Sequence, residues 1–142
     1  MTYIDKKNFD IFFHTNDIRI EAPIFEVDEL IAPIISLLNK KGYKTQYCCS
    51  GHYNESKFEG SELLHDNCYI VFKSINDFKD VTQIKIPQDF LLEPNEYGNE
   101  QFTIRKYYKT HLIDRYFEII ETMKDLLEWV NKLPWKKFFI KM

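Results

Sequence analysis

Apolar residues recur along the chain in patterns that predict both strands and helices. Residues 8–14 and 17–27 are rich in Ile and Phe, and a short polar stretch separates them, which predicts two strands joined by a tight turn. Every second residue of the later stretch is apolar, as on a strand with one buried face, at Ile18, Ile20, Ala22 and Ile24.

Residues 28–41 predict the first helix. Asp28 is a residue type that caps helix N-termini, apolar pairs recur at helical spacing, and Gly42 can take the left-handed conformation that ends a helix. The chain then enters a predicted strand at 43–49. Strict alternation places on one face of that strand Tyr43, Thr45, Tyr47 and Cys49, and on the other Lys44, Gln46 and Cys48.

The second half of the chain predicts more strands and one long helix. Strands are expected at 68–74, 81–86 and 101–108, with a short additional one at 90–93. A helix at 111–132, capped by Thr110 and ended by Leu133-Pro134, has apolar residues at helical spacing. The fold class expected is therefore α+β, a single mostly antiparallel sheet with two main helices packed on one face.

Composition favours one folded domain, 1–142. The chain of 142 residues is 44% hydrophobic and contains no repeat and no linker rich in Gly, Ser or Pro, which argues against disordered and fibrous classes. A formal net charge of −3 gives no bulk basic field for duplex DNA.

Three features point to a reduced protein inside the cell. No apolar run approaches the roughly 18 residues of a membrane-spanning helix, and the first residues lack the apolar stretch of a signal peptide. Three Cys residues cannot form a complete disulfide framework. We expect a cytoplasmic protein that does not act at a membrane.

The segment Cys48-Cys49-Ser50-Gly51-His52 stands out as a candidate site. Gly51 permits a left-handed backbone, and successive amides around such a residue can form an anion-binding nest, with Ser50 and His52 beside it. Arg105 offers a bidentate guanidinium on the same predicted sheet. The prediction is a small anionic ligand or nucleotide bound by Cys49, Ser50, Gly51, His52 and Arg105; the alternative is a plain turn that ends a strand.

The residues around this turn also carry a resemblance. The stretches 28–45 and 47–52, and the later stretches 69–72 and 102–105, resemble small bacteriophage and mobile-element proteins with a Cys-Ser-Gly-His signature. The resemblance spans most of the chain and implies an accessory protein, without implying an activity.

A shorter resemblance points to RNA modification. Cys49-Ser50-Gly51 is similar to the Ser-Cys-Ser-Gly element of the wybutosine-synthesis methyltransferase, which acts on tRNA with S-adenosylmethionine. It implies an RNA-modifying or nucleotide-modifying enzyme that uses that cofactor. His52 stands where that family tends to have Arg, and no matching downstream block follows.

Two other chemistries are compatible with the turn. Zinc is one: the spacing of two ligand pairs fits a four-ligand site in a zinc-stabilised interaction module, at Cys49, His52, His65 and Cys68. Against it, Cys68 is also placed to point into the core with Ile70 and Phe72, and we expect no metal. The second is a Cys49 nucleophile with His52 or His65 as base, oriented by a carboxylate of Glu55, Glu59 or Asp66. The sequence does not decide whether the protein is an enzyme.

Two partner classes follow from surface residues. The sheet face opposite the helices is expected to carry basic and aromatic side chains of the kind that bind RNA, at Lys44, Gln46, Tyr69, Lys73, Arg105 and Tyr107. The C-terminal tail mixes apolar and basic residues and suggests contact with a second subunit, through Trp135, Phe138 and Phe139.

Overall fold

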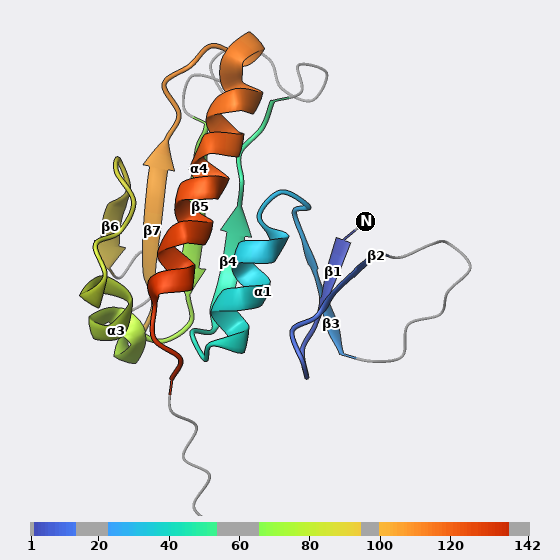
Figure 1. Ribbon diagram of the computed structural model, residues 1–142, viewed down its shortest axis with the longest axis vertical. Coiled ribbons are helices and arrows are strands. Elements are labelled where there is room, and N and C mark those ends of the chain that lie inside the picture. The colour runs from blue at the N-terminus through green and yellow to red at the C-terminus, as the bar shows by residue number, and fades with distance from the viewer. Residues whose placement is uncertain (1, 14–22, 54–65, 95–99, 137–142) are drawn as a thin grey trace, which may run out of the picture.

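The fold is α+β and contains two antiparallel sheets (Figure 1). The computed structural model describes residues 2–13, 23–53, 66–94 and 100–136. A three-stranded sheet has the order β2-β1-β3, with β1 (Thr2–Asp5), β2 (Ile11–Phe13) and β3 (Ile24–Val27). A four-stranded sheet has the order β4-β5-β7-β6, with β4 (Thr45–Cys49), β5 (Asn67–Phe72), β6 (Leu91–Pro94) and β7 (Phe102–Tyr107).

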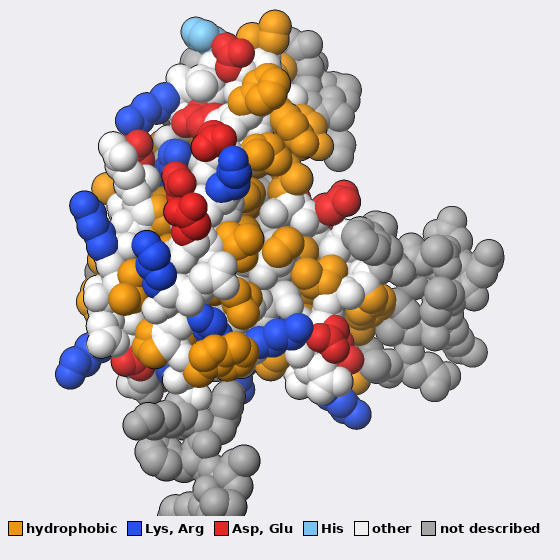
Figure 2. All heavy atoms as spheres, in the orientation of Figure 1, with side chains coloured by type: hydrophobic (Ala, Val, Ile, Leu, Met, Phe, Trp, Pro, Cys, Tyr) orange, Lys and Arg blue, Asp and Glu red, His pale blue; other side chains and the backbone are white. Residues whose placement is uncertain are grey.

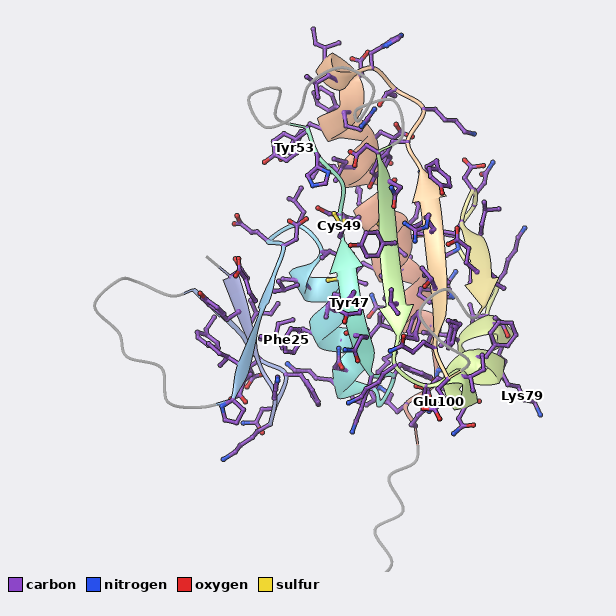
Figure 3. All side chains as sticks on the ribbon, turned by 180° about the vertical axis from the view of Figure 1, so that it is seen from behind. Phe25, Tyr47, Cys49, Tyr53, Lys79 and Glu100 are labelled. Carbon is purple, nitrogen blue, oxygen red and sulfur yellow. The ribbon has the colours of Figure 1, made fainter. Side chains whose placement is uncertain are left out.

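Two of the helices cover one face of the four-stranded sheet. They are α1 (Ala32–Lys40) and α4 (Leu112–Lys132), which lie side by side over β4, β5 and β7 (Figure 1). A short helix, α3 (Phe78–Gln83), follows a single 3₁₀ turn, η2 (Ile75–Asp77), beyond the end of β5. In the described part of the chain, no helix lies over the opposite face, which we call the outer face (Figure 3).

The main core fills the space between the helices and the inner face of the larger sheet. Phe72 and Phe102 stack there with ring centroids 4.7 Å apart. Fully buried apolar side chains of the strands pack there against fully buried apolar side chains of the helices, namely Ile70, Phe72, Ile104, Ile34, Ile35, Leu38, Ile119 and Leu126. Cys68 also faces this core, as its position in β5 predicts.

A buried lysine joins the two main helices. The ammonium group of Lys41 donates to the backbone carbonyls of Val130, Asn131 and Leu133, at 2.9, 3.0 and 2.7 Å. These carbonyls lie in the last turn of α4 and just after it, where the usual amide partners four residues on are missing, so a cation there adds donors and complements the helix dipole. Burial lowers the pKa of Lys41.

The prediction of a single sheet with an N-terminal hairpin is wrong. β2 and β3 are not paired with each other, because β1 lies between them and pairs with both. Residues 18–22, where the alternation was predicted, lie outside the described residues. Pairing between β1 and β3 joins positions far apart in sequence, which a local pattern does not report.

A second correction concerns residues 81–86, which form no strand. Residues 78–83 are helical, and Ile84 has left the helix in an extended conformation. Phe78 and Val81 pack into the core from positions three residues apart, which is helical spacing. Ser74 begins the segment by accepting a hydrogen bond from the Asn76 amide at 3.2 Å.

The two predicted helix caps are also wrong. α1 begins at Ala32, four residues after Asp28, and α4 begins at Leu112 with His111 in the capping position. Gly42 does follow α1 with a φ of +100°, as predicted.

The C-terminal tail is described as far as residue 136. Trp135 is 59% exposed and its ring lies 5.6 Å from the ammonium group of Lys41. Phe138 and Phe139 lie outside the described residues, so contact with a second subunit stays a prediction. In the described part of the chain, no helix combines the length and apolar character needed to cross a membrane.

Candidate functional site

The register of the larger sheet puts two of the predicted site residues in one row. Cys49 stands opposite Tyr69, and Tyr69 stands opposite Arg105 on the next strand. Directly opposed residues point to the same face of an antiparallel sheet. Since Ile70 and Ile104 face the core, Cys49, Tyr69 and Arg105 point to the outer face.

A β-bulge in β4 sets this orientation. The register shifts between Thr45 and Tyr47, so Gln46 is an extra residue in the strand. Thr45 pairs with the inward-facing Phe72, whereas Tyr47 and Cys49 point outward. The predicted strict alternation, with Thr45 on the face of Cys49, is therefore wrong at the bulge.

The turn after β4 is held by its own glycine and a buried tyrosine. Gly51 has a φ of +104°, and a Cβ atom there would lie 2.3 Å from Cε2 of Tyr108. The Tyr108 hydroxyl donates to the Ser50 carbonyl at 2.5 Å. Glycine is needed at this position for both its backbone conformation and the space that the ring occupies.

Asp28 receives the donors of Ser50. Its carboxylate accepts the Ser50 amide at 3.1 Å and also the Ser50 hydroxyl. Asp28 therefore fixes the turn to the segment that leads into α1.

Asp66 receives the donors of His52. Its carboxylate accepts the His52 amide at 2.6 Å and contacts Nδ1 of the His52 ring at 2.9 Å. The same carboxylate accepts the Asn67 amide at 3.0 Å and forms a buried ion pair with Arg115 at 2.9 Å. A carboxylate with this many partners is fixed in position, and it fixes the imidazole ring in turn.

The other ring nitrogen of His52 faces the thiol of Cys49. Nε2 lies 4.0 Å from Sγ, and the Gly51 amide donates to the same sulfur at 3.4 Å. With Nδ1–H donating to Asp66, Nε2 carries the lone pair that can accept a thiol proton. Cys49, His52 and Asp66 thus form a continuous chain of thiol, imidazole and carboxylate.

Burial favours the protonated form of the two thiols of β4. It raises the pKa of Cys49, and the Asp28 and Asp66 carboxylates act in the same direction, while the Gly51 hydrogen bond opposes them. Burial raises the pKa of Cys48 to about 12. Cys48 packs against the core on the other face of β4, so only Cys49 is directed at the histidine.

The site lies at the surface beside apolar groups. The His52 side chain is 42% exposed. Tyr47 and Tyr53 flank Cys49 along the same edge of the sheet (Figure 3), and Tyr53 meets the Tyr116 ring at a centroid distance of 4.9 Å. Exposed apolar side chains continue over the start of α4 (Figure 2), including Ile113 and Phe117.

The predicted anion nest has the expected glycine conformation, but the protein's own carboxylates engage its donors. The Ser50 and His52 amides and the Ser50 hydroxyl bind Asp28 and Asp66. Arg105 donates to both Glu93 oxygens and to Asn67, and it stacks on Tyr69 at 4.9 Å. An external anion at the turn stays a prediction, and it would compete with these contacts.

The zinc and RNA hypotheses also stay predictions. Among the described residues, no group of three or more His, Cys, Asp or Glu side chains could hold a metal ion. His65 lies outside them, and Cys68 faces the core while Cys49 faces outward. On the outer face, Tyr107 is exposed and Arg105 is largely buried.

Sequence reasoning missed three residues that build the site. The sequence pattern predicts a helix cap at Asp28, and no motif singles out Tyr108 or Arg115. Asp66 was one of three candidate carboxylates, and its place directly before β5 was the available signal. A strand end facing a neighbouring strand end brings their flanking residues together.

Comparison of the chain with known protein families, with curated proteins and with solved structures finds no match. The functional argument therefore depends on the geometry of the site.

Proposed function

We propose that the protein is a thiol-dependent enzyme of the acyl-transfer class, in which Cys49 is the nucleophile, His52 the general base and Asp66 a positioning residue. One observation carries the proposal: Nε2 of His52 lies 4.0 Å from Sγ of Cys49 while Nδ1 contacts Asp66 at 2.9 Å. A nucleophile that contacts a base, which in turn contacts an orienting third group, is the signature of nucleophilic catalysis.

The reaction proposed is ester or thioester hydrolysis in two steps. Sγ of Cys49 bonds to the substrate carbonyl carbon as the thiol proton moves to Nε2 of His52. The bond to the leaving group breaks, and the leaving group takes that proton, which leaves a thioester on Cys49. Water then attacks the thioester and gives its proton to His52, the bond from sulfur to carbon breaks, and the proton returns to the sulfur.

The Gly51 amide is suited to stabilise the oxyanion of these steps. It lies 3.4 Å from the sulfur, whereas the amides on either side of it bind carboxylates. A backbone donor next to the attacking atom can turn to the oxygen that becomes negative in the tetrahedral intermediate.

Two properties of the surroundings of Cys49 limit which mechanism and which substrates fit the site. Because burial raises the pKa of Cys49, the resting thiol is protonated, which favours proton removal by His52 during attack over a preformed thiolate. The exposed rings of Tyr53 and Tyr116 favour a substrate whose acyl or leaving group is apolar or aromatic.

The experiment is a burst assay with an aromatic ester such as p-nitrophenyl acetate. Wild type should release the phenol in a burst, as Cys49 is acylated. His52→Ala should slow that acylation by about a hundredfold or more, the usual contribution of a general base. His111→Ala removes an exposed histidine at the start of α4 and is the matched control. The proposal is wrong if His52→Ala and His111→Ala give equal bursts, or if wild type gives no burst.

A further inference from the structure

A second candidate site lies at the other end of β4, between the two sheets. A cavity of about 370 Å³ is lined there by residues of β3, β4 and the neighbouring segments, including Lys6, Phe9, Phe25, Glu26, Lys44 and Lys73. We call it the lysine groove. Phe25 reaches toward β4 from β3 on the side seen in Figure 3.

Positive charge in the groove exceeds negative charge. Three lysines, Lys6, Lys44 and Lys73, line the groove with one carboxylate, Glu26. In the described part of the chain, none of the three lysines is in an ion pair. The chain as a whole has a net charge of −3, so this local excess runs against the overall charge.

Two of the lysines are held next to each other by the strand pairing. The Lys73 amide donates to the Lys44 carbonyl at 2.9 Å, one position beyond the Thr45–Phe72 pair. Like charges opposed across strands destabilise a sheet. The bulge at Gln46 lies beside them, and bulges commonly direct side chains at binding sites.

The apolar wall of the groove includes a residue in an unfavourable conformation. Phe9 has a φ of +59°, which is rare for a bulky residue. Its amide donates to the Asp5 carbonyl at 2.7 Å, and its carbonyl accepts the Ser36 hydroxyl at 2.5 Å. Strain of this kind persists where the surrounding structure imposes it, often at ligand sites.

We propose that the lysine groove binds a nucleoside phosphate, with the phosphates among Lys6, Lys44 and Lys73 and the base against Phe9 and Phe25. Ammonium groups supply the charge that phosphate oxygens need, and aromatic side chains supply a stacking surface for any base. The volume lies within the usual range of small-molecule sites, roughly 300–1,000 Å³. This inference does not depend on the proposed chemistry at Cys49.

The test is calorimetric titration of the full chain at constant ionic strength with ADP, with adenosine and with pyrophosphate. ADP should bind more tightly than either fragment, because only ADP uses both the lysines and the rings. The double substitution K44Q/K73Q should weaken ADP binding by about tenfold or more, given the usual strength of hydrogen bonds to charged groups. Phe25→Leu should weaken ADP binding and leave pyrophosphate binding unchanged.

Lys79→Gln is the matched control, because Lys79 is an exposed lysine on α3 at the opposite side of the larger sheet from Phe25 (Figure 3). It should leave ADP binding unchanged, as should Cys49→Ala. The proposal is overturned if ADP does not bind, if pyrophosphate binds as tightly as ADP, or if K79Q weakens binding as much as K44Q/K73Q. Circular dichroism of each variant confirms that it is folded.

Discussion

The two ends of β4 differ in how their polar groups are satisfied. At the C-terminal end, Ser50 and His52 bind internal carboxylates, and Asp66 is paired with Arg115. At the N-terminal end, Lys44 and Lys73 stand opposed without an ion pair among the described residues. One strand thus has a closed network at one end and unbalanced charge at the other.

The difference shows that polar groups on one strand suit different tasks, depending on whether the protein itself already pairs them. A closed network fixes the geometry of reacting groups before a substrate arrives, which is what catalysis needs. Unbalanced charge attracts a ligand of opposite sign, which is what binding needs. The sequence predicts anion recognition at the turn, which stays a prediction, and the structure brings a thiol, an imidazole and a carboxylate together there.

Removal of the Asp66 carboxylate should give the largest effect on stability. Asp66→Ala removes the carboxylate that forms a buried ion pair with Arg115, which is 2% exposed. Breaking a buried pair costs about 3–5 kcal/mol of unfolding free energy. Urea denaturation measures the loss.

The control for Asp66→Ala is Lys124→Ala, which breaks an exposed ion pair with Glu121 at 3.7 Å. Its expected loss is less than about 1 kcal/mol. Equal small losses in the two variants would show that the closed network contributes little to the fold.

A methyl group added at Gly51 should cause the next largest loss of stability. Gly51→Ala combines a positive φ with a Cβ position 2.3 Å from the Tyr108 ring, and we expect a loss of about 2–3 kcal/mol. Gly42→Ala has a similar φ but meets the Lys136 side chain at 2.8 Å, so its loss should be smaller. Thermal or urea unfolding of both variants ranks them. A larger loss at Gly42 would contradict the tight packing of the turn on Tyr108.

The pH dependence of thiol alkylation separates the two cysteines of β4. The pKa of Cys49 is raised above 9.0, so its reaction with iodoacetamide should accelerate about tenfold per pH unit through pH 8 and beyond. Cys48, whose pKa is raised to about 12, should react more slowly at every pH. Mass spectrometry of the two positions gives both profiles. A plateau for Cys49 near neutral pH would indicate a resting thiolate and contradict the general-base mechanism.

The smallest change in stability is expected from a substitution in the lysine groove. Lys73→Gln relieves repulsion from Lys44, so it should raise the unfolding free energy by a few tenths of a kcal/mol, up to about 1. The gain should shrink at high salt because the charges are exposed. Denaturation at two salt concentrations measures it. A clear loss of stability would show that Lys73 has a favourable partner.

Local patterns predicted the features that depend on single residues or short periods. The positive φ of Gly42 and Gly51, the inward orientation of Cys68 and the outward orientation of Arg105 followed from residue type and alternation. These properties are set within a few residues along the chain, so the sequence reports them directly.

Features that depend on distant pairing were not predictable in this way. No local signal placed β1 between β2 and β3, and the bulge at Gln46 reversed the expected face of Thr45. The choice of Asp66 over Glu55 and Glu59 needed the pairing of β4 with β5, which brings residues 49 and 69 opposite each other. Strand pairing of this range depends on the whole fold.

The most direct test of the account is to map the acyl group after brief exposure of the folded protein to an aromatic acetate ester. The account predicts an early thioester at Cys49, which hydroxylamine removes and which is absent in Cys49→Ala. Cys48 and Cys68 should stay unlabelled, because burial raises the pKa of both thiols and they face the core. Labelling that begins at Cys48 or at lysines, with Cys49 unmodified, would contradict the assignment of Cys49 as the nucleophile.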